Sequence, residues 1–201
     1  MKIFAISDLH LSSAQPKPMD IFGDGWTDYW SSIETDWKEK VSDDDIVLIP
    51  GDISWAMRLS DALPDLRLIG AMKGRKILLR GNHDYWWNTI GKVRDALPEG
   101  TYAIQNDCVR FGDFLFCGSR GWTCPDKGEL EPEDKKIYLR EAERLRLSFE
   151  CMSKMRKEGD KVVCLMHFPP FNVRREDSEY TKLIIKYDID CVVYGHLHGR
   201  D

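Results

Sequence analysis

Short apolar runs alternate along this chain with longer segments of helical periodicity. The apolar runs are typical of buried strands and cover residues 3–7, 46–50, 76–80, 102–104, 108–111, 114–117, 161–166 and 191–194. Between them, apolar residues recur every three or four positions and predict helices over residues 27–40, 59–72, 89–97, 132–157 and 179–187. This alternation of strands and helices indicates an α/β fold.

The segment 102–117 departs from that alternation, because its strands are joined only by the short polar connections 105–107 and 112–113. Such spacing predicts antiparallel hairpins, so we expect a mixture of parallel and antiparallel strand pairs. The sequence has no internal repeat, low-complexity tract or linker rich in proline and glycine. We therefore expect one domain over residues 1–201.

Polar residues gather directly after the carboxyl ends of five predicted strands. They are Asp8-Leu9-His10, Gly51-Asp52, Gly81-Asn82-His83-Asp84, His167 and Gly195-His196-Leu197-His198. Ligands of open α/β sheets bind at this edge, so five separate loops can converge there. A single histidine is more often structural than functional, but all 5 histidines of the chain belong to this set. Their joint placement favours a metal site.

The composition of the chain limits the kinds of partner that it can bind. The 29 basic and 34 acidic residues give a net charge of -5, which argues against non-specific binding of nucleic acid and favours a small substrate. The sequence has neither an apolar stretch long enough for a bilayer nor a signal-peptide pattern, so we expect a cytoplasmic protein without membrane contact. The 6 cysteines form no C-x-x-C pair. We interpret them as buried, reduced thiols rather than a disulfide or zinc framework, with Cys117 and Cys124 the first pair to check.

The five polar blocks resemble those of the calcineurin-like metallophosphoesterases: Asp-x-His, Gly-Asp, Gly-Asn-His-Asp, His and Gly-His-x-His, in this order from Asp8 to His198. The resemblance implies a four-layer α/β/β/α sandwich with a binuclear metal site at its edge. It also implies two ligand sets, which are Asp8, His10, Asp52 and His198 for one metal and Asp52, Asn82, His167 and His196 for the other. By the same resemblance, His83 faces the substrate, where it protonates the leaving group or binds a phosphoryl oxygen. Asp84 is a candidate for orienting a histidine.

The donor types make chemical sense for two divalent ions. Ions roughly 3.5 to 4 Å apart repel each other, and a shared carboxylate such as Asp52 offsets that repulsion. Imidazole, carboxylate and amide donors without thiolate favour manganese, iron, zinc or nickel. A hydroxide held between the two ions is then a nucleophile near neutral pH. We therefore expect hydrolysis of a phosphate ester, with diesters or pyrophosphates ahead of small monoesters.

Further residues have two readings. Trp55 and Trp86 can form a wall for the substrate or pack the core, and Arg120 can bind phosphate or form an ion pair.

The alternatives to a small-molecule phosphoesterase are a nuclease or protein phosphatase, and a metal-stabilised scaffold without turnover. Relatives usually continue with further strands, whereas this sequence ends three residues after His198, as a chain truncated at its C-terminus would.

Overall fold

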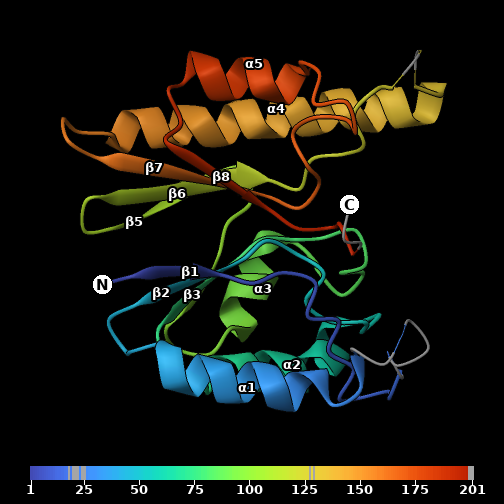
Figure 1. The fold of residues 1–201 in the computed structure, drawn as a ribbon, viewed down its shortest axis with the longest axis vertical. Coiled ribbons are helices and arrows are strands. Elements are labelled where there is room, and N and C mark those ends of the chain that lie inside the picture. The colour runs from blue at the N-terminus through green and yellow to red at the C-terminus, as the bar shows by residue number, and fades with distance from the viewer. Residues whose placement is uncertain (18, 20–22, 24–25, 127, 129, 199–201) are drawn as a thin grey trace. The chain divides into compact units, whose positions relative to one another are not determined.

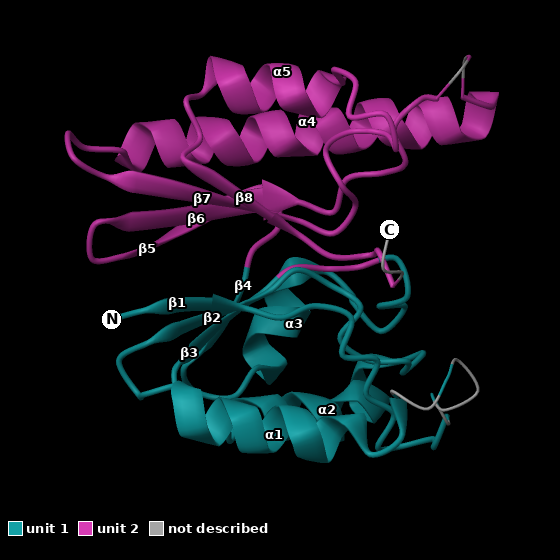
Figure 2. Cartoon of the chain, in the orientation of Figure 1, with its two compact units in different colours: residues 1–78, 82–103 teal, residues 79–81, 104–201 magenta. Residues whose placement is uncertain are grey.

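The computed structural model describes residues 1–17, 19, 23, 26–126, 128 and 130–198. The chain divides into two compact units, which Figure 2 shows in teal and magenta. The first consists of residues 1–78 and 82–103, and the second of residues 79–81 and 104–201. Each has a sheet and a hydrophobic core of its own. The single domain expected from the sequence stays a prediction.

The first unit contains a parallel sheet in the order β1-β2-β3-β4. Its strands are β1 (Ile3–Ala5), β2 (Ile46–Ile49), β3 (Arg75–Leu78) and β4 (Thr101–Ala103). The helices α1 (Tyr29–Lys40), α2 (Leu59–Gly70) and α3 (Ile90–Ala96) each connect one strand to the next (Figure 1). Parallel strands need such crossovers, because a tight turn cannot bring the chain back to the same end of the sheet.

The core of this unit lies between its sheet and its helices. Val47 and Ile49 of β2 belong to it, together with Trp37 of α1, Leu66 of α2 and Val93 of α3. Alternate residues of a strand face opposite sides of a sheet, so one side of β2 packs against all three helices. The strand ends are thereby held on a rigid support.

The second unit contains a mixed sheet in the order β5-β6-β7-β8. Its strands are β5 (Cys108–Phe111), β6 (Phe114–Ser119), β7 (Lys161–Met166) and β8 (Cys191–Tyr194). The β5–β6 pair is antiparallel, and the pairs β6–β7 and β7–β8 are parallel. The helix α4 (Pro132–Met155) connects β6 to β7, and α5 (Glu179–Lys186) connects β7 to β8.

The core of the second unit lies against α4. Leu145, Phe149 and Met152 of this helix pack with Cys117 of β6 and Cys164 of β7. The opposite face of α4 is strongly charged and carries ion pairs between arginine and glutamate side chains. The amphipathic pattern that predicted this helix therefore also places it on its sheet.

The structure confirms every predicted strand and helix, with no end shifted by more than two residues, and confirms the mixed α/β class. One prediction of pairing is wrong. The segment 102–104 forms no hairpin with 108–111, because β4 follows the α3 crossover and pairs in parallel with β3. Only the hairpin of β5 and β6 is present as expected.

The cysteines are partly as predicted. All are thiols, and Cys117, Cys124 and Cys164 are buried. The prediction of burial is wrong for Cys191, which is exposed at the start of β8. Among the helices of the described residues, none has the length and apolar character that a bilayer span requires.

Candidate metal centre

The loop after β1 carries Asp8 and His10. Its backbone remains paired with the loop after β2, since the N–H of Asp8 donates to the carbonyl of Gly51 at 3.1 Å and the N–H of His10 to the carbonyl of Asp52 at 2.9 Å. Both residues have a positive φ, 58° at Asp8 and 47° at His10. Residues other than glycine rarely adopt this backbone conformation, and strained residues of this kind cluster at functional sites.

Asp52 is the central residue of this loop pair and is only 1% exposed. Its φ is 51°, and it follows Gly51, whose φ is 103°. Its Oδ1 accepts the backbone N–H of His83 at 2.8 Å, and its Oδ2 lies 3.8 Å from Nε2 of His10. Asp52 therefore connects the loops that follow β1, β2 and β3.

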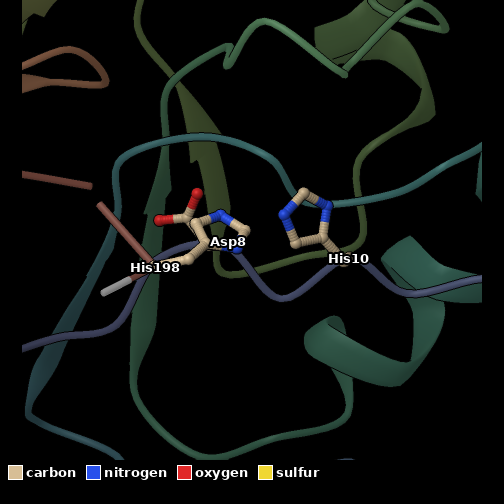
Figure 3. A group of neighbouring side chains, drawn as sticks. All are labelled: Asp8, His10 and His198. Atoms are coloured by element: carbon tan, nitrogen blue, oxygen red, sulfur yellow. The ribbon is translucent and has the colours of Figure 1, made fainter. Parts of the chain in front are cut away.

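Asp8, His10 and Asp52 have the chemistry and spacing of metal ligands. A carboxylate oxygen of Asp8 lies within 4.8 Å of a ring nitrogen of His10 and of a carboxylate oxygen of Asp52. Figure 3 shows Asp8 and His10 on the loop after β1 and also labels His198 of the second unit. Imidazole and carboxylate together suit zinc, iron, nickel and manganese. These side chains of the first unit therefore fit a divalent ion.

The charges around Asp52 also favour a bound cation. The pKa of Asp52 is raised to about 7, first by burial and then by the carboxylate of Asp84, with a smaller contribution from Asp8. The backbone N–H groups of His83 and Asn82 act in the opposite direction. Carboxylates that repel one another in a buried place are stabilised by a bound cation, because an opposite charge favours their ionised forms.

Asp84 is fully buried behind this group. Its Oδ1 accepts three N–H groups: the backbone of Ile53 at 2.9 Å, the backbone of Ser54 at 3.2 Å and the indole of Trp86 at 2.9 Å. These bonds fix the segment that directly follows Asp52. These contacts let Asp84 position the Asp52 loop, and the role in orienting a histidine stays a prediction of the sequence.

His83 is half-buried and belongs to a cluster of rings. The ring of Trp55 stacks on His10 with a centroid distance of 4.6 Å and an interplanar angle of 19°, and lies 4.6 Å from the ring of His83. The rings of His10 and His83 are 5.8 Å apart. His83 therefore lies beside the candidate ligands with its backbone bound to Asp52.

The second unit carries the other histidines. His167 directly follows β7 and is fully buried. Its backbone N–H and that of Phe168 both donate to the carbonyl of Arg120, at 3.0 and 2.9 Å. The ring of His196 lies 5.2 Å from that of His167 and 4.1 Å from that of Phe168. The structure thus brings His167 and His196 together at the carboxyl ends of β7 and β8.

His196 has a φ of 71°, so three candidate ligand loops contain left-handed residues that are not glycine. The N–H of Gly195 donates to the carbonyl of His167 at 3.1 Å and ties the two loops together. His198 is exposed near the end of the described chain. Asn82 is half-buried between Gly81 and His83.

The candidate substrate contacts differ in their surroundings. Trp86 is 1% exposed and packs in the core of the first unit, 5.2 Å from the ring of Trp87. Trp55 is half-buried and lines a cleft. Arg120 forms an ion pair with the buried Glu141 at 3.2 Å. Burial lowers the pKa of Arg120, while Glu141 acts against this shift.

Sequence reasoning missed two features of this region. The left-handed backbone at Asp8, His10 and Asp52 left no signal except the glycine that precedes Asp52. The ammonium group of Lys17 lies 3.4 Å from the ring centroid of Trp55. The two residues come from different loops, so neither periodicity nor spacing pointed to their contact.

Comparisons with known proteins agree with this fold. The crystal structure of phosphopantetheinyl hydrolase (PptH) from Mycobacterium tuberculosis is similar, with a TM-score of 0.57 and 15% identity over 98% of this chain and 82% of that chain. The protein of unknown function AQ665 from Aquifex aeolicus has a TM-score of 0.44 and 19% identity over 94% of this chain and 87% of that chain. No curated protein matches the sequence. A model of the calcineurin-like phosphoesterases matches residues 1–200, and the chain therefore belongs to that family.

Proposed function

We propose that the chain is a phosphohydrolase with a binuclear metal centre, for which Asp52 supplies the shared carboxylate. Membership of the calcineurin-like phosphoesterases supports metal-dependent hydrolysis of phosphate esters. The observation that carries the proposal is the environment of Asp52. Its side chain is buried, its pKa is raised first by that burial and then by neighbouring carboxylates, and it lies 3.8 Å from the imidazole of His10.

The proposed ligands are those that the family resemblance implies. Asp8, His10, Asp52 and His198 would hold one metal, and Asp52, Asn82, His167 and His196 would hold the other. Manganese, iron, zinc and nickel all suit this donor set. Divalent ions, when bound, supply Lewis acidity and lower the pKa of coordinated water.

His83 is the proposed proton donor to the leaving group. It lies next to the ring of His10, its backbone is bound to Asp52, and none of the proposed metal sets includes it. An imidazole is suited to proton transfer near neutral pH. Asp84 acts indirectly, because its contacts hold the Ile53-Ser54 segment beside Asp52.

The proposed substrates are small phosphate diesters or pyrophosphates rather than monoesters. The net charge of -5 supports a small substrate over nucleic acid. The likeness to the phosphopantetheinyl hydrolase rests on 15% identity and supports the fold, not a substrate. A cytoplasmic location remains a prediction of the sequence.

The test compares bis(p-nitrophenyl) phosphate with p-nitrophenyl phosphate after the protein has been loaded with manganese. The proposal predicts release of p-nitrophenol from the diester at the higher kcat/KM, and loss of the activity with a chelator. Preference for the monoester would contradict the proposed substrate class. Hydrolysis of neither compound, with metal bound, would favour a scaffold without turnover.

A further inference from the structure

Two thiols of the second unit lie in direct contact. The Sγ atoms of Cys108, at the start of β5, and Cys151, near the end of α4, are 3.1 Å apart. The strand and the helix belong to the same compact unit (Figure 2). Both cysteines are partly exposed, so a small molecule in solvent can reach the pair. A disulfide bond is about 2.05 Å long, so the two sulfur atoms need to approach each other by only about 1 Å.

The backbone on both sides of the pair is held in place by hydrogen bonds. One turn before Cys151, the hydroxyl of Ser148 donates to the carbonyl of Asp107, the residue that precedes Cys108, at 2.6 Å. The oxygen of the same hydroxyl accepts the N–H of Gly118 in β6 at 2.8 Å. Two groups that a fixed scaffold holds together react as if they were highly concentrated, because folding has already brought them together. The contact therefore favours a bond between these two sulfur atoms.

The other cysteines of the core are less suited to oxidation. Cys117 and Cys124, the first pair that the sequence suggested, are buried, and their thiols donate to the carbonyls of Val163 at 3.9 Å and Pro169 at 3.8 Å. Cys164 is paired with Cys117 across β6 and β7 and is also buried. A dissolved oxidant does not reach buried thiols, whereas it reaches the partly exposed pair of β5 and α4.

We infer that Cys108 and Cys151 form a reversible disulfide that ties β5 to α4 when the surroundings become oxidising. The inference is independent of the proposed function. The oxidant is a small disulfide such as oxidised glutathione. The thiolate of one cysteine attacks a sulfur atom of the oxidant and releases the first glutathione. The other cysteine loses its proton to solvent, attacks the mixed disulfide and releases the second glutathione. The protein gives up two electrons and two protons, and the oxidant becomes two thiols.

The surroundings of the pair limit the speed of this reaction. Burial, and then the hydrogen bond with Cys151, raise the pKa of Cys108 well above its usual range. The thiolate is the nucleophile in thiol–disulfide exchange, so a thiol that stays protonated reacts slowly. The disulfide therefore forms under sustained oxidation rather than during a brief exposure.

The chemical test incubates the folded protein for a prolonged time with oxidised glutathione, blocks the remaining thiols with N-ethylmaleimide and maps the bonds by mass spectrometry after digestion with trypsin. Cys108 and Cys151 fall in separate tryptic peptides, residues 95–110 and 147–154, each with a single cysteine. We expect these two peptides to be joined, and dithiothreitol to separate them. Cys191 is exposed and should carry glutathione, which reports how far the oxidation has gone.

Four variants accompany the wild type in this test. Cys108→Ser and Cys151→Ser should each lose the link and carry glutathione on the remaining cysteine of the pair. Cys191→Ser removes a thiol outside the pair, and Met155→Leu removes the thioether whose Sδ lies 3.3 Å from Sγ of Cys108. Both of these controls should form the link as the wild type does.

Two results of the mapping would overturn the inference. The first is a wild-type protein in which Cys191 is fully modified while Cys108 and Cys151 stay free or carry glutathione separately. The second is a link that forms to the same extent in urea-unfolded protein, because the folded contact would then play no part in it.

Thermal unfolding tests the tie between β5 and α4. β5 is the edge strand of its sheet and pairs with β6 alone, and the bond would join residues 43 positions apart. Such a link restricts the unfolded chain, so the oxidised wild type should unfold about 5 to 10 °C above the reduced protein. Cys151→Ser should have the same midpoint under both conditions. Equal midpoints for the linked and the reduced wild type would contradict the inference.

Discussion

The buried carboxylate of Asp84 accepts the backbone N–H of Ile53 at 2.9 Å, directly after the proposed bridging residue Asp52. The same oxygen accepts the N–H of Ser54 and the indole N–H of Trp86. One side chain from the loop after β3 therefore holds the loop after β2 in its left-handed conformation. The conformation of the proposed metal site therefore depends on this contact as well as on the proposed metal ligands.

Replacement of Asp84 by Ala should destabilise the protein by about 3 kcal/mol, because three buried N–H groups lose a charged acceptor. Asp84→Asn keeps an oxygen in place and should cost less. Urea denaturation measures both, with Asp36→Ala on the exposed face of α1 as the control, expected within about 0.5 kcal/mol of wild type. A wild-type midpoint for Asp84→Ala would contradict the anchoring role.

Loss of His83 should separate metal binding from catalysis. His83→Ala is expected to keep its metal content and to lose about 100- to 10,000-fold in kcat, the range for removal of a general acid. The loss should be larger for an alkyl leaving group, which needs a proton, than for p-nitrophenolate. Metal analysis together with kinetics on both kinds of substrate provides the check. An unchanged rate with the alkyl ester would exclude His83 as the acid.

The backbones of β6 and β7 pack so closely that no room is left for a side chain at Gly118. Its φ is 152°, and a Cβ atom at this position would lie 1.8 Å from the carbonyl oxygen of Leu165 in the paired strand β7. Gly118→Ala should therefore destabilise the protein by about 3 kcal/mol. The control is Gly91→Ala in α3, where the added Cβ meets no atom within 4 Å and helix propensity favours alanine. Equal thermal midpoints for the two variants would refute the packing argument.

The pH dependence of stability should include a contribution from Asp160. The guanidinium of Arg110, with help from the N–H of Lys157, lowers the pKa of Asp160 from 3.8 to about 2. A carboxyl group whose pKa is lower in the folded than in the unfolded protein stabilises the fold at pH values above its unfolded pKa. This stabilisation is lost as the pH falls through its folded pKa. Asp160→Asn should thus be less stable than wild type at pH 7, and the difference should shrink between pH 4 and 2. A difference independent of pH in urea denaturation would be inconsistent with this pair.

Much of the fold could be predicted because each element carries its own signal. The buried run at β2 and the amphipathic pattern of α4 are local properties of the sequence, and both elements lie where expected. The partner of β4 could not be predicted in the same way. Its short connection to β5 indicated a hairpin, yet the α3 crossover brings it beside β3. Strand pairing depends on the path of the chain, which a local pattern does not contain.

The candidate site also combines features that local sequence patterns predict with features that they do not. The placement of Asp8, Asp52 and His167 at strand ends follows from the apolar runs that precede them. The contact of Lys17 with Trp55 depends on how two loops pack, and the sequence carries no regular spacing that encodes it. Trp86 illustrates the converse, since its closeness to the polar block suggested the substrate, whereas its indole lies buried against Asp84.

The metal content of Asp52→Ala tests the central claim most directly. Wild-type protein and the variant are loaded with manganese, freed of excess ion and analysed for bound metal, with circular dichroism to verify folding. If Asp52 is the shared ligand, the wild type retains two equivalents and the variant retains none, together with loss of all turnover. A folded Asp52→Ala protein that still binds two equivalents would contradict the account.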